Sequence, residues 1–387
     1  MAQESDRVKI YESFDSIEGI PVDLLRGIYA YGFEKPSEIQ KRAIKPIIDG
    51  QDVLAQAQSG TGKTGAFSIG SISRIDLAIN NVQVLIMAPT RELAQQIEGV
   101  MTSLTNHMKI TLMLATGGNP VRDDVSALQR GAHIVIGTPG RIYDLMDRGA
   151  LKRDNIKVLI LDEADQMLEG RFREQTECIL NMGFPEQTKV ALFSATMPDE
   201  VVEVAGKLLK DPVNILLPPE KVTLEGIRQF YVTVDEESWK FDCLSDIYQH
   251  MNISQAIIYC GTRSKVEWLQ KRLQENNFEV GYIHGEMEPK ERKACIKAFR
   301  NGSVRVLISS DLLARGLDVQ QVSLVINFEL PDKRENYIHR IGRSGRFGRK
   351  GVAINIVTPA EYRELQEIEK HYATSITPLP KNIGELL

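Results

Sequence analysis

The stretch Asp-Val-Leu-Ala-Gln-Ala-Gln-Ser-Gly-Thr-Gly-Lys-Thr, residues 52–64, decides the fold of this chain. Its apolar start predicts a short strand, and a helical pattern begins near Gly65. Gly60 and Gly62 allow backbone N–H groups to turn toward an anion, and the following helix N-terminus adds a positive dipole. A strand, a glycine-rich loop and a helix in this order predict a nucleotide phosphate site. The alternative is a flexible glycine-rich turn that binds nothing.

The residues of this loop have distinct expected roles. Lys63 would reach the β- and γ-phosphates, and the Thr64 hydroxyl would ligate magnesium. The first position of the usual phosphate-loop pattern holds Ala57 where glycine is common. The loop residues expected to contact the nucleotide are Ser59, Gly60, Thr61 and Gly62.

Apolar runs rich in Val, Ile and Leu recur along both halves of the chain. Each run is followed by turn residues and a helical pattern, which is typical of parallel strands buried on both faces of a sheet. We therefore predict an α/β fold with two tandem domains, each a mainly parallel sheet with helices on both faces. The runs are 84–87, 134–136, 158–161 and 190–193 in the first half, and 256–259, 304–308 and 324–327 in the second.

The boundary between the domains is predicted at a Pro-Pro pair, Pro218-Pro219, which suits neither a helix nor a central strand. Domain one is expected over 1–217, a linker over 218–224 and domain two over 225–387. The tail from Ser375 to Leu387 has little pattern and is expected to pack loosely.

Composition excludes several classes of protein. The 387 residues are 42% hydrophobic and 26% charged, with a net charge of -5. A polycation that binds nucleic acid by bulk charge is excluded, whereas a local basic groove is not. The four cysteines lack metal-ligand spacing and predict reduced thiols. The polar N-terminus predicts no signal peptide, and no apolar run reaches the ~18 residues of a membrane span.

Two carboxylates follow the apolar run at 158–161, which places Asp162 at the carboxyl edge of the sheet. We expect Asp162 to hold magnesium through water and Glu163 to polarise the attacking water. Strand-end carboxylates are otherwise common as helix N-caps. The phosphate loop upstream favours the catalytic interpretation.

Two further segments extend the prediction. Gln40 offers a donor and an acceptor that suit adenine, and Phe33 could stack on a base, although the segment alone reads as a loop entering a helix. Arginines recur every third residue from Arg340 to Arg349. An arginine that reaches the terminal phosphate accelerates phosphoryl transfer by roughly 10³–10⁵. The alternative for this run is a solvated basic face.

These motifs, in this order over residues 12–387, resemble a DEAD-box RNA helicase of superfamily two. Ala57 is normal at its position in that family. The resemblance identifies Gln40 and Phe33 with the adenine-sensing motif, to which Phe14 belongs as an upstream aromatic. It makes Arg343 and Arg346 arginine fingers. The chain most resembles the eukaryotic translation initiation factor 4A subgroup, with exon-junction and ribosome-biogenesis relatives close behind.

The resemblance also implies the remaining site residues. Asp318 would contact the ATP ribose. The residues implied for coupling hydrolysis to RNA binding are Asp165, Ser194, Thr196 and His339. The residues implied for RNA contact are Pro89, Thr90, Arg91, Gly117, Gly118, Thr138, Pro139, Gly140, Arg141 and Ser310. Two positions depart from the family: Gly261 stands where Asn is usual, and Pro289 where Gln is usual, so RNA affinity or coupling is expected to differ.

The expected function is an ATP- and magnesium-dependent RNA helicase that hydrolyses ATP on binding RNA and separates short duplexes. It would read the RNA backbone and not its sequence. The alternatives are an ATP-locked RNA clamp, a phosphate-loop enzyme acting on a small molecule or DNA, and a scaffold without ATP chemistry. The subgroup implies a scaffold protein of the cap-binding complex and an RNA-binding cofactor as partners. A cytoplasmic monomer without membrane contact is expected, with nuclear residence left open.

Overall fold

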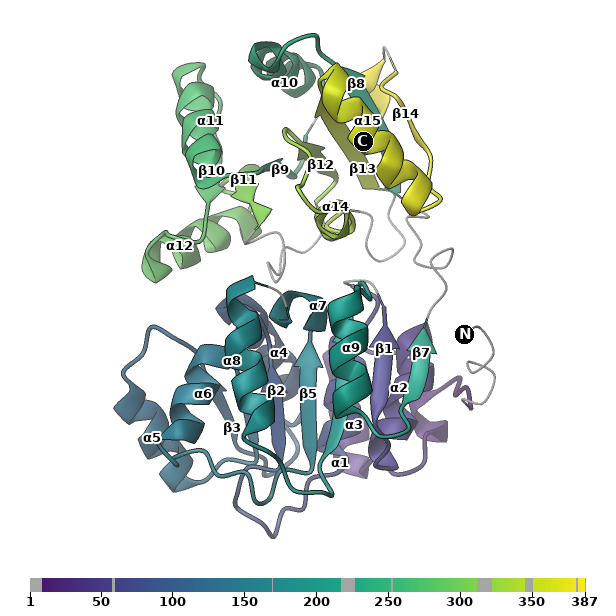
Figure 1. Ribbon diagram of the computed structural model, residues 1–387, viewed down its shortest axis with the longest axis vertical. Coiled ribbons are helices and arrows are strands. Elements are labelled where there is room, and N and C mark those ends of the chain that lie inside the picture. Colours follow the sequence, from purple (N-terminus) through teal and green to yellow (C-terminus); the bar gives the residue numbers. More distant parts are fainter. Residues whose placement is uncertain are drawn as a thin grey trace. The chain divides into compact units, whose positions relative to one another are not determined.

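The computed structural model describes residues 9–57, 60–168, 170–216, 227–251, 253–311, 322–344, 351–380 and 382–386. The chain divides into two compact units, Met1–Leu217 (unit one) and Pro218–Leu387 (unit two). Figure 1 shows a sheet flanked by helices in each unit. The predicted linker, 218–224, lies outside the described residues.

Within its described residues, unit one contains a sheet of seven parallel strands in the order β3-β4-β2-β5-β6-β1-β7. The strands are β1 (Val53–Gln56), β2 (Val84–Met87), β3 (Leu112–Ala115), β4 (Ile134–Gly137), β5 (Val158–Asp162), β6 (Lys189–Ser194) and β7 (Val213–Leu216). The helices are η2 (Phe14–Ser16, 3-10), α1 (Val22–Tyr31), α2 (Glu38–Ile48), α3 (Lys63–Ile72), α4 (Arg91–Leu104), α5 (Val121–Arg130), α6 (Pro139–Asp147), α7 (Ala164–Met167), α8 (Gly170–Asn181) and α9 (Asp199–Leu208).

Unit two repeats this plan, with seven described parallel strands in the order β10-β11-β9-β12-β13-β8-β14. The strands are β8 (Ile227–Thr233), β9 (Ala256–Cys260), β10 (Val280–Ile283), β11 (Val306–Ser310), β12 (Leu324–Asn327), β13 (Gly351–Val357) and β14 (Ile376–Pro378). The helices are η4 (Glu237–Trp239, 3-10), α10 (Lys240–His250), α11 (Arg263–Glu275), α12 (Pro289–Arg300), α14 (Arg334–Ile341), α15 (Pro359–His371) and η5 (Ile383–Glu385, 3-10).

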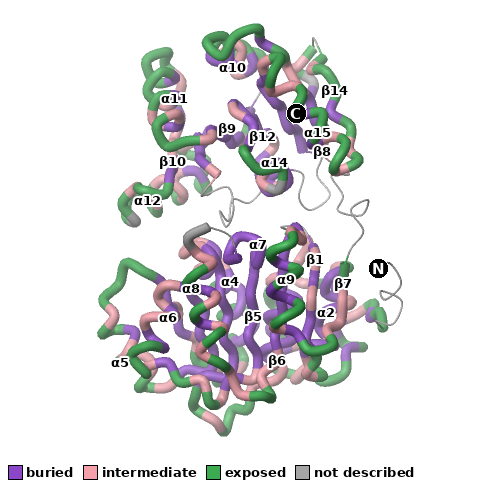
Figure 2. The backbone as a smooth tube through the Cα atoms, in the orientation of Figure 1, coloured by how far each residue is buried: buried purple, intermediate pink, exposed green. Residues whose placement is uncertain are grey.

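The apolar runs are continuous because each central strand is covered on both faces. Ile86 and Ile160 enter the core on one face of sheet one, whereas Leu85 and Leu159 enter the core on the other. Successive side chains of a strand point to opposite faces, so both sets must be apolar. Figure 2 shows the strands as the buried layer of each unit and the helices as partly exposed. The predicted two-domain α/β class is confirmed.

The C-terminal segment corrects one expectation, because it is packed and not loose. Ile376 lies in β14, which pairs with β8, and Leu386 is buried in a core of unit two. The Arg228 guanidinium donates to the carbonyl of Leu386. Strand pairing, the burial of Leu386 and this hydrogen bond hold a segment that shows no periodicity. Among the described helices, none has the length and apolar character needed to cross a membrane.

Candidate functional site

Sheet topology gathers the predicted residues of unit one at a single edge. Parallel strands share one carboxyl edge, and ligands of such sheets bind there. The loops after β1, β6 and β5 carry the predicted nucleotide residues, and those after β2, β4 and β3 carry the predicted RNA residues. Since β5 and β2 are hydrogen-bonded neighbours, the two halves of the edge adjoin.

The phosphate loop requires glycine at two positions. Gly60 and Gly62 have φ values of 85° and 101°, in the region that favours glycine. A Cβ on Gly62 would also lie 2.7 Å from the Ser37 hydroxyl oxygen. Lys63 begins α3 and is 6% exposed, and its Nζ atom has no hydrogen-bond partner among the described residues. Ser59 lies outside the described residues.

The Gln40 amide joins the start of α2 to the predicted phosphate loop. Its Nε2 donates to the Gly62 carbonyl oxygen over 3.1 Å, and its Oε1 accepts from the Ser37 N–H over 2.9 Å. The second bond belongs to a capping box at the start of α2, which the Ser-x-x-Gln spacing could have revealed from sequence. A placement of Gln40 that suits the base therefore also positions the loop that faces the phosphates.

Aromatic packing fixes Phe33 beside this loop. A Cβ on Gly65 would lie 3.1 Å from the Phe33 ring, so glycine lets the ring approach α3. Phe14 is fully buried and stacks on Phe33 with ring centroids 6.2 Å apart. Phe14 therefore supports Phe33 from behind and does not offer a surface of its own.

Asp162 and Glu163 lie at the end of β5 and are 2% and 4% exposed. Burial raises the pKa of Asp162 to about 6, the Lys63 charge opposes that shift, and the Glu163 and Asp165 carboxylates add to it. Glu163 adopts a left-handed backbone with φ of 52°. Its Oε2 atom has no partner among the described residues. A non-glycine residue in this conformation is typical of a functional position.

Ser194 and Thr196 connect the two sides of the nucleotide half. The Thr196 hydroxyl donates to the Asp165 carboxylate over 2.6 Å. The Asp165 N–H donates to the Ser194 hydroxyl over 3.3 Å, and the Ala57 N–H donates to the Ser194 carbonyl over 2.9 Å. These bonds connect the start of the predicted phosphate loop, through the end of β6, to Asp165 after β5.

These groups fit a triphosphate with a divalent cation. A buried ammonium and a buried carboxylate oxygen that lack partners are costly unless a ligand supplies them. Lys63 Nζ can donate hydrogen bonds to phosphate oxygens. A cation bound beside Asp162 would stabilise the ionised carboxylate and so lower the pKa that burial raises. No cluster of three or more His, Cys, Asp or Glu side chains suited to a metal occurs among the described residues. Magnesium commonly binds one or two carboxylates together with phosphates and water, and Asp162 offers one such carboxylate.

The other half of the edge presents small residues and one cation. Thr90 caps α4, accepting from the Leu93 N–H over 3.2 Å, and so sets the start of that helix. A Cβ on Gly118 would lie 2.5 Å from an Arg91 nitrogen, and its φ is 97°. Gly117 and Gly118 are exposed, and Pro89 is buried. Arg91 and an exposed backbone therefore lie together after β2 and β3.

Arg141 has a different environment from the one expected. Its guanidinium pairs with Asp124 and donates to the Asn119 carbonyl over 2.7 Å. Both side chains of the pair are only 9% exposed. Arg141 thus fastens the start of α6, with Thr138, Pro139 and Gly140, to the loop after β3. Asp124 was missed from sequence because nothing marks it among the acidic residues of α5.

In unit two, the described predicted residues also lie near a carboxyl edge. Ser310 ends β11 and is 5% exposed, with no partner for its hydroxyl among the described residues. His339 lies in α14, and Arg343 follows it, both buried. Asp318 and Arg346 lie outside the described residues.

A buried ion pair anchors α14, and sequence reasoning assigned it no role. Arg340 is fully buried, and its guanidinium donates to both carboxylate oxygens of Asp311, one of them over 2.7 Å. It also donates to the Asn327 side chain over 3.1 Å and to the Glu329 carbonyl over 2.6 Å. Because Arg343 follows three residues later, this pair determines where Arg343 lies.

The two departures from the family pattern lie at this edge. The Gly261 N–H donates to the Glu329 carboxylate over 2.7 Å, and a Cβ there would meet the same carboxylate at 3.4 Å, an ordinary contact. The structure therefore leaves room for a side chain at Gly261. Pro289 is the first residue of α12, where proline's missing N–H costs nothing.

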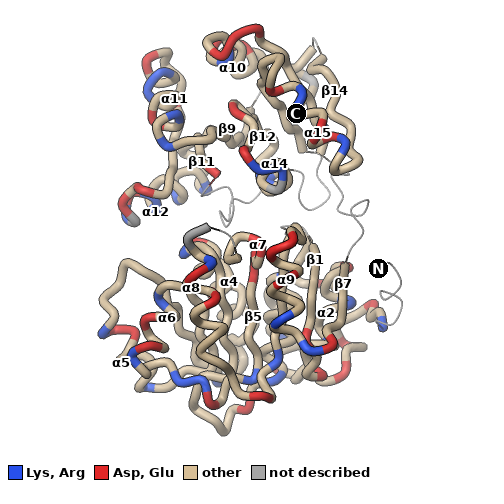
Figure 3. The backbone as a smooth tube through the Cα atoms, viewed as in Figure 1, with Lys and Arg blue, Asp and Glu red and all other residues tan. Residues whose placement is uncertain are grey.

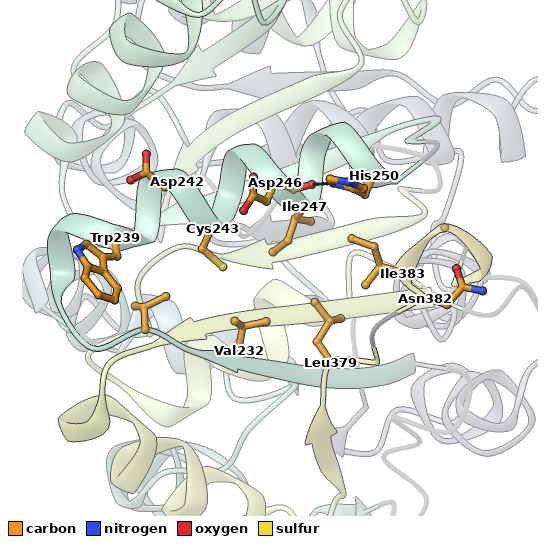
Figure 4. A pocket seen from close by; sticks show the side chains of 12 residues that line it. Val232, Trp239, Asp242, Cys243, Asp246, Ile247, His250, Leu379, Asn382 and Ile383 are labelled. Carbon is orange, nitrogen blue, oxygen red and sulfur yellow. Dashed lines mark hydrogen bonds between the residues drawn. The ribbon is translucent and has the colours of Figure 1, made fainter.

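A further hollow lies elsewhere in unit two, and none of the predicted site residues lines it. It measures about 750 Å³ and lies between β8, α10 and the C-terminal segment. Figure 4 shows Trp239 and Asp242 at one end and Ile383 and Asn382 at the other, with His250 bonded to the Asp246 carbonyl. A shallow hollow of this composition does not supply phosphate ligands.

Comparison with known proteins agrees with the geometry. The DEAD/DEAH box helicase model matches residues 37–204, and the helicase conserved C-terminal domain model matches residues 239–348. An ATP-dependent RNA helicase eIF4A from Neosartorya fischeri is 55% identical over 99% of this chain and 96% of its own length. Eukaryotic initiation factor 4A from Caenorhabditis elegans is 52% identical over 99% of this chain and 95% of its own.

Solved structures give the same result. S. cerevisiae Dbp5 bound to RNA and ADP BeF3 is 36% identical, covers 96% of both chains and has a TM-score of 0.88. Mss116p bound to ssRNA and AMP-PNP is 28% identical over 96% of this chain and 80% of its own, with a TM-score of 0.85.

Proposed function

We propose that this chain, which belongs to the DEAD/DEAH box helicase family, is an RNA-dependent ATPase that separates short RNA duplexes during translation initiation. Its relatives at 55% and 52% identity carry the names of an RNA helicase and an initiation factor. The observation that carries the chemistry is a buried group in which Lys63 Nζ and Glu163 Oε2 have no partner among the described residues and burial raises the pKa of Asp162.

Each of these three side chains has a role in the proposed hydrolysis. Lys63 binds the terminal phosphates, since its buried Nζ has no partner among the described residues. Glu163 accepts a hydrogen bond from the attacking water and orients it through Oε2, which no described residue engages. Gln40 and Phe33 hold the adenine, with Gly60, Thr61 and Gly62 around the phosphates.

Asp162 and the Thr64 hydroxyl are the proposed magnesium ligands, through water or directly. The ion, when bound, neutralises charge on the phosphate oxygens as the terminal bond loosens. Arg343 and Arg346 are proposed to add positive charge at the terminal phosphate, and Asp318 to contact the ribose. The hydrogen bond from Thr196 to Asp165 supports a coupling role for this pair, together with Ser194 and His339.

RNA is proposed to lie along the loops after β2, β3 and β4, and beside Ser310. Arg91, Gly117 and Gly118 present a cation and exposed backbone, which suits phosphate and sugar contacts without base readout. Arg141 acts there as a positioning residue, because its donors are engaged by Asp124 and Asn119. Thr90, Thr138 and Gly140 complete this surface, and the buried Pro89 and Pro139 shape its backbone.

As an initiation factor, the chain is proposed to act in the cytoplasm as a monomer. Its proposed partners are a scaffold protein of the cap-binding complex and an RNA-binding cofactor. The support is identity to factors of that name over 99% of the chain.

ATP hydrolysis measured with and without single-stranded RNA tests the function. RNA is expected to raise turnover, and Glu163→Gln is expected to lower RNA-stimulated turnover at least 100-fold while ATP and RNA still bind. The exposed Glu174→Gln is the matched control and should behave as wild type. Equal rates of ATP hydrolysis with and without RNA would contradict the proposal. A long-lived RNA complex without duplex separation would indicate a clamp instead.

A further inference from the structure

Helix α12 of unit two carries a row of cations along one exposed face. Lys290, Lys293, Lys297 and Arg300 are spaced three, four and three residues apart, and all four are exposed. This spacing places them on one side of a helix. Phe299 is fully buried on another side, against the core of the unit. We call these four residues the α12 stripe.

Several exposed cations on other described helices pair with a carboxylate one turn away. Arg148 pairs with Asp144 in α6, Lys207 with Glu203 in α9, and Arg263 with Glu267 in α11. Among the described residues, Lys290, Lys293 and Lys297 have no ion pair of this kind. Their neighbours at three and four positions within the stripe are one another and Arg300.

Like charges at this spacing destabilise a helix. The stripe places two such lysine pairs in succession, 290 with 293 and 293 with 297. Figure 3 marks the charged residues along this helix. In a protein of net negative charge, these neighbouring lysines favour an external anion as their partner.

The stripe begins beside the proposed RNA site of unit two. Strand β10 leads into α12, and β10 is the hydrogen-bonded neighbour of β11, which ends at Ser310. The amines span about 15 Å of helix, since each residue rises about 1.5 Å. That length matches two to three phosphate intervals of a single strand. The exposed positions among them include no aromatic side chain, so the surface would read charge and not bases.

We propose that the α12 stripe binds the phosphates of single-stranded RNA outside the segment held at the carboxyl edge. This inference rests on the proposed function and deepens it. Removing the lysines should keep or raise the thermal stability of the protein, because repulsion within the helix is relieved. The same change should weaken RNA binding, because contacts to the phosphates are lost. A merely structural role predicts loss of stability instead.

The test variant combines Lys290→Gln, Lys293→Gln and Lys297→Gln. The charge-matched control combines Lys207→Gln, Lys271→Gln and Lys370→Gln, which are exposed lysines on α9, α11 and α15. Binding of a labelled 20-nucleotide single-stranded RNA is measured between 50 and 200 mM KCl, with a non-hydrolysable ATP analogue present. Each lost phosphate contact lowers the slope of log affinity against log salt by about 0.7.

The magnitude of this slope should be about 2 smaller for the stripe variant than for wild type, and unchanged for the control. Over that salt range, wild-type affinity should then fall about 20-fold more than the variant's. The melting temperature of the variant should equal or exceed that of wild type, and basal ATPase should not change. Should the triple variant fail to fold, Lys293→Gln alone is expected to lower the slope by about 0.7.

Equal slopes for the stripe variant and wild type would overturn the stripe while leaving the helicase function intact, provided that RNA still stimulates ATPase. A wild-type protein that neither binds RNA nor responds to it would overturn both proposals.

Discussion

Replacing Arg340 with Met should destabilise unit two by a measurable and calculable amount. The side chain is fully buried and makes bonds to Asp311, Asn327 and the Glu329 carbonyl. Methionine has a similar length and no charge, so the space stays largely filled. The main consequence is an Asp311 carboxylate without its partner.

The magnitude follows from the burial of the two partners. Breaking a buried ion pair by removing one partner costs about 3–5 kcal/mol. The Asp311 side chain is 22% exposed, so water compensates in part and the lower end, about 3 kcal/mol, applies. With a urea slope of about 2 kcal/mol/M, the unfolding midpoint should fall by about 1.5 M.

Tryptophan fluorescence isolates the relevant transition. The two tryptophans of the chain, Trp239 and Trp268, both lie in unit two, in η4 and α11. Urea unfolding of the full chain followed at their emission therefore reports unit two. Arg141→Met, which breaks the buried pair with Asp124 in unit one, is the matched control and should leave this transition unchanged.

Asp311→Asn provides the second arm of the test. In the double variant Arg340→Met/Asp311→Asn, no charge remains unpaired. Its loss of unfolding free energy should therefore be about 2 kcal/mol smaller than the sum of the losses in the two single variants. A midpoint shift below about 0.3 M for Arg340→Met would refute the reasoning, because the pair would then contribute no more than an exposed one.

Three further outcomes are expected in unit one. Thr196→Val removes the bond to Asp165, so duplex separation should fall at least tenfold while ATP still binds, and unchanged separation would remove the coupling role. Gly62→Ala forces a side chain into a φ of 101°, so ATP affinity measured by fluorescent analogue should fall at least 100-fold, and wild-type affinity would contradict the loop geometry. Burial lowers the pKa of His133, whose Nδ1 accepts a hydrogen bond from the Thr111 N–H. The neutral imidazole therefore stabilises the fold above pH 6.5, and this contribution to the free energy of unfolding is lost as the pH falls. Wild-type stability should therefore decline below pH 6.5 more steeply than that of His133→Asn, by at most about 1.4 kcal/mol per pH unit, and parallel urea-unfolding profiles would exclude this role.

The strands that could be predicted from sequence are those with both faces covered. β2, β4, β5 and β6 read as unbroken apolar runs because each contributes to two cores. β3 and β7 lie at the sheet edges, where buried residues are mixed with half-buried or exposed ones, so they lack that signal. β13 is buried throughout, but Asn355 interrupts its run, because that side chain bonds to Asn327 and the Phe230 carbonyl.

Site residues divide in a similar way. Lys63, Asp162 and Glu163 could be predicted because their spacing to a glycine loop or a strand end is local. The environment of Arg141 could not, because its partner Asp124 is seventeen positions away on another helix. The Arg340–Asp311 pair spans twenty-nine positions. Long-range pairs between charged residues depend on topology, and no local pattern carries that information.

Gln40 shows why a single amide can serve both the base and the phosphate loop. A glutamine side chain has two N–H donors and two acceptor positions. One N–H of Gln40 donates to the Gly62 carbonyl, and its oxygen accepts from the Ser37 N–H. One N–H donor and one acceptor position of the amide therefore remain. Adenine presents one acceptor and one amino donor on its N7 edge, which the remaining pair matches, whereas guanine presents two acceptors there. The internal bonds fix the orientation of the amide, so the proposed role of Gln40 in holding adenine would follow from its packing against the loop.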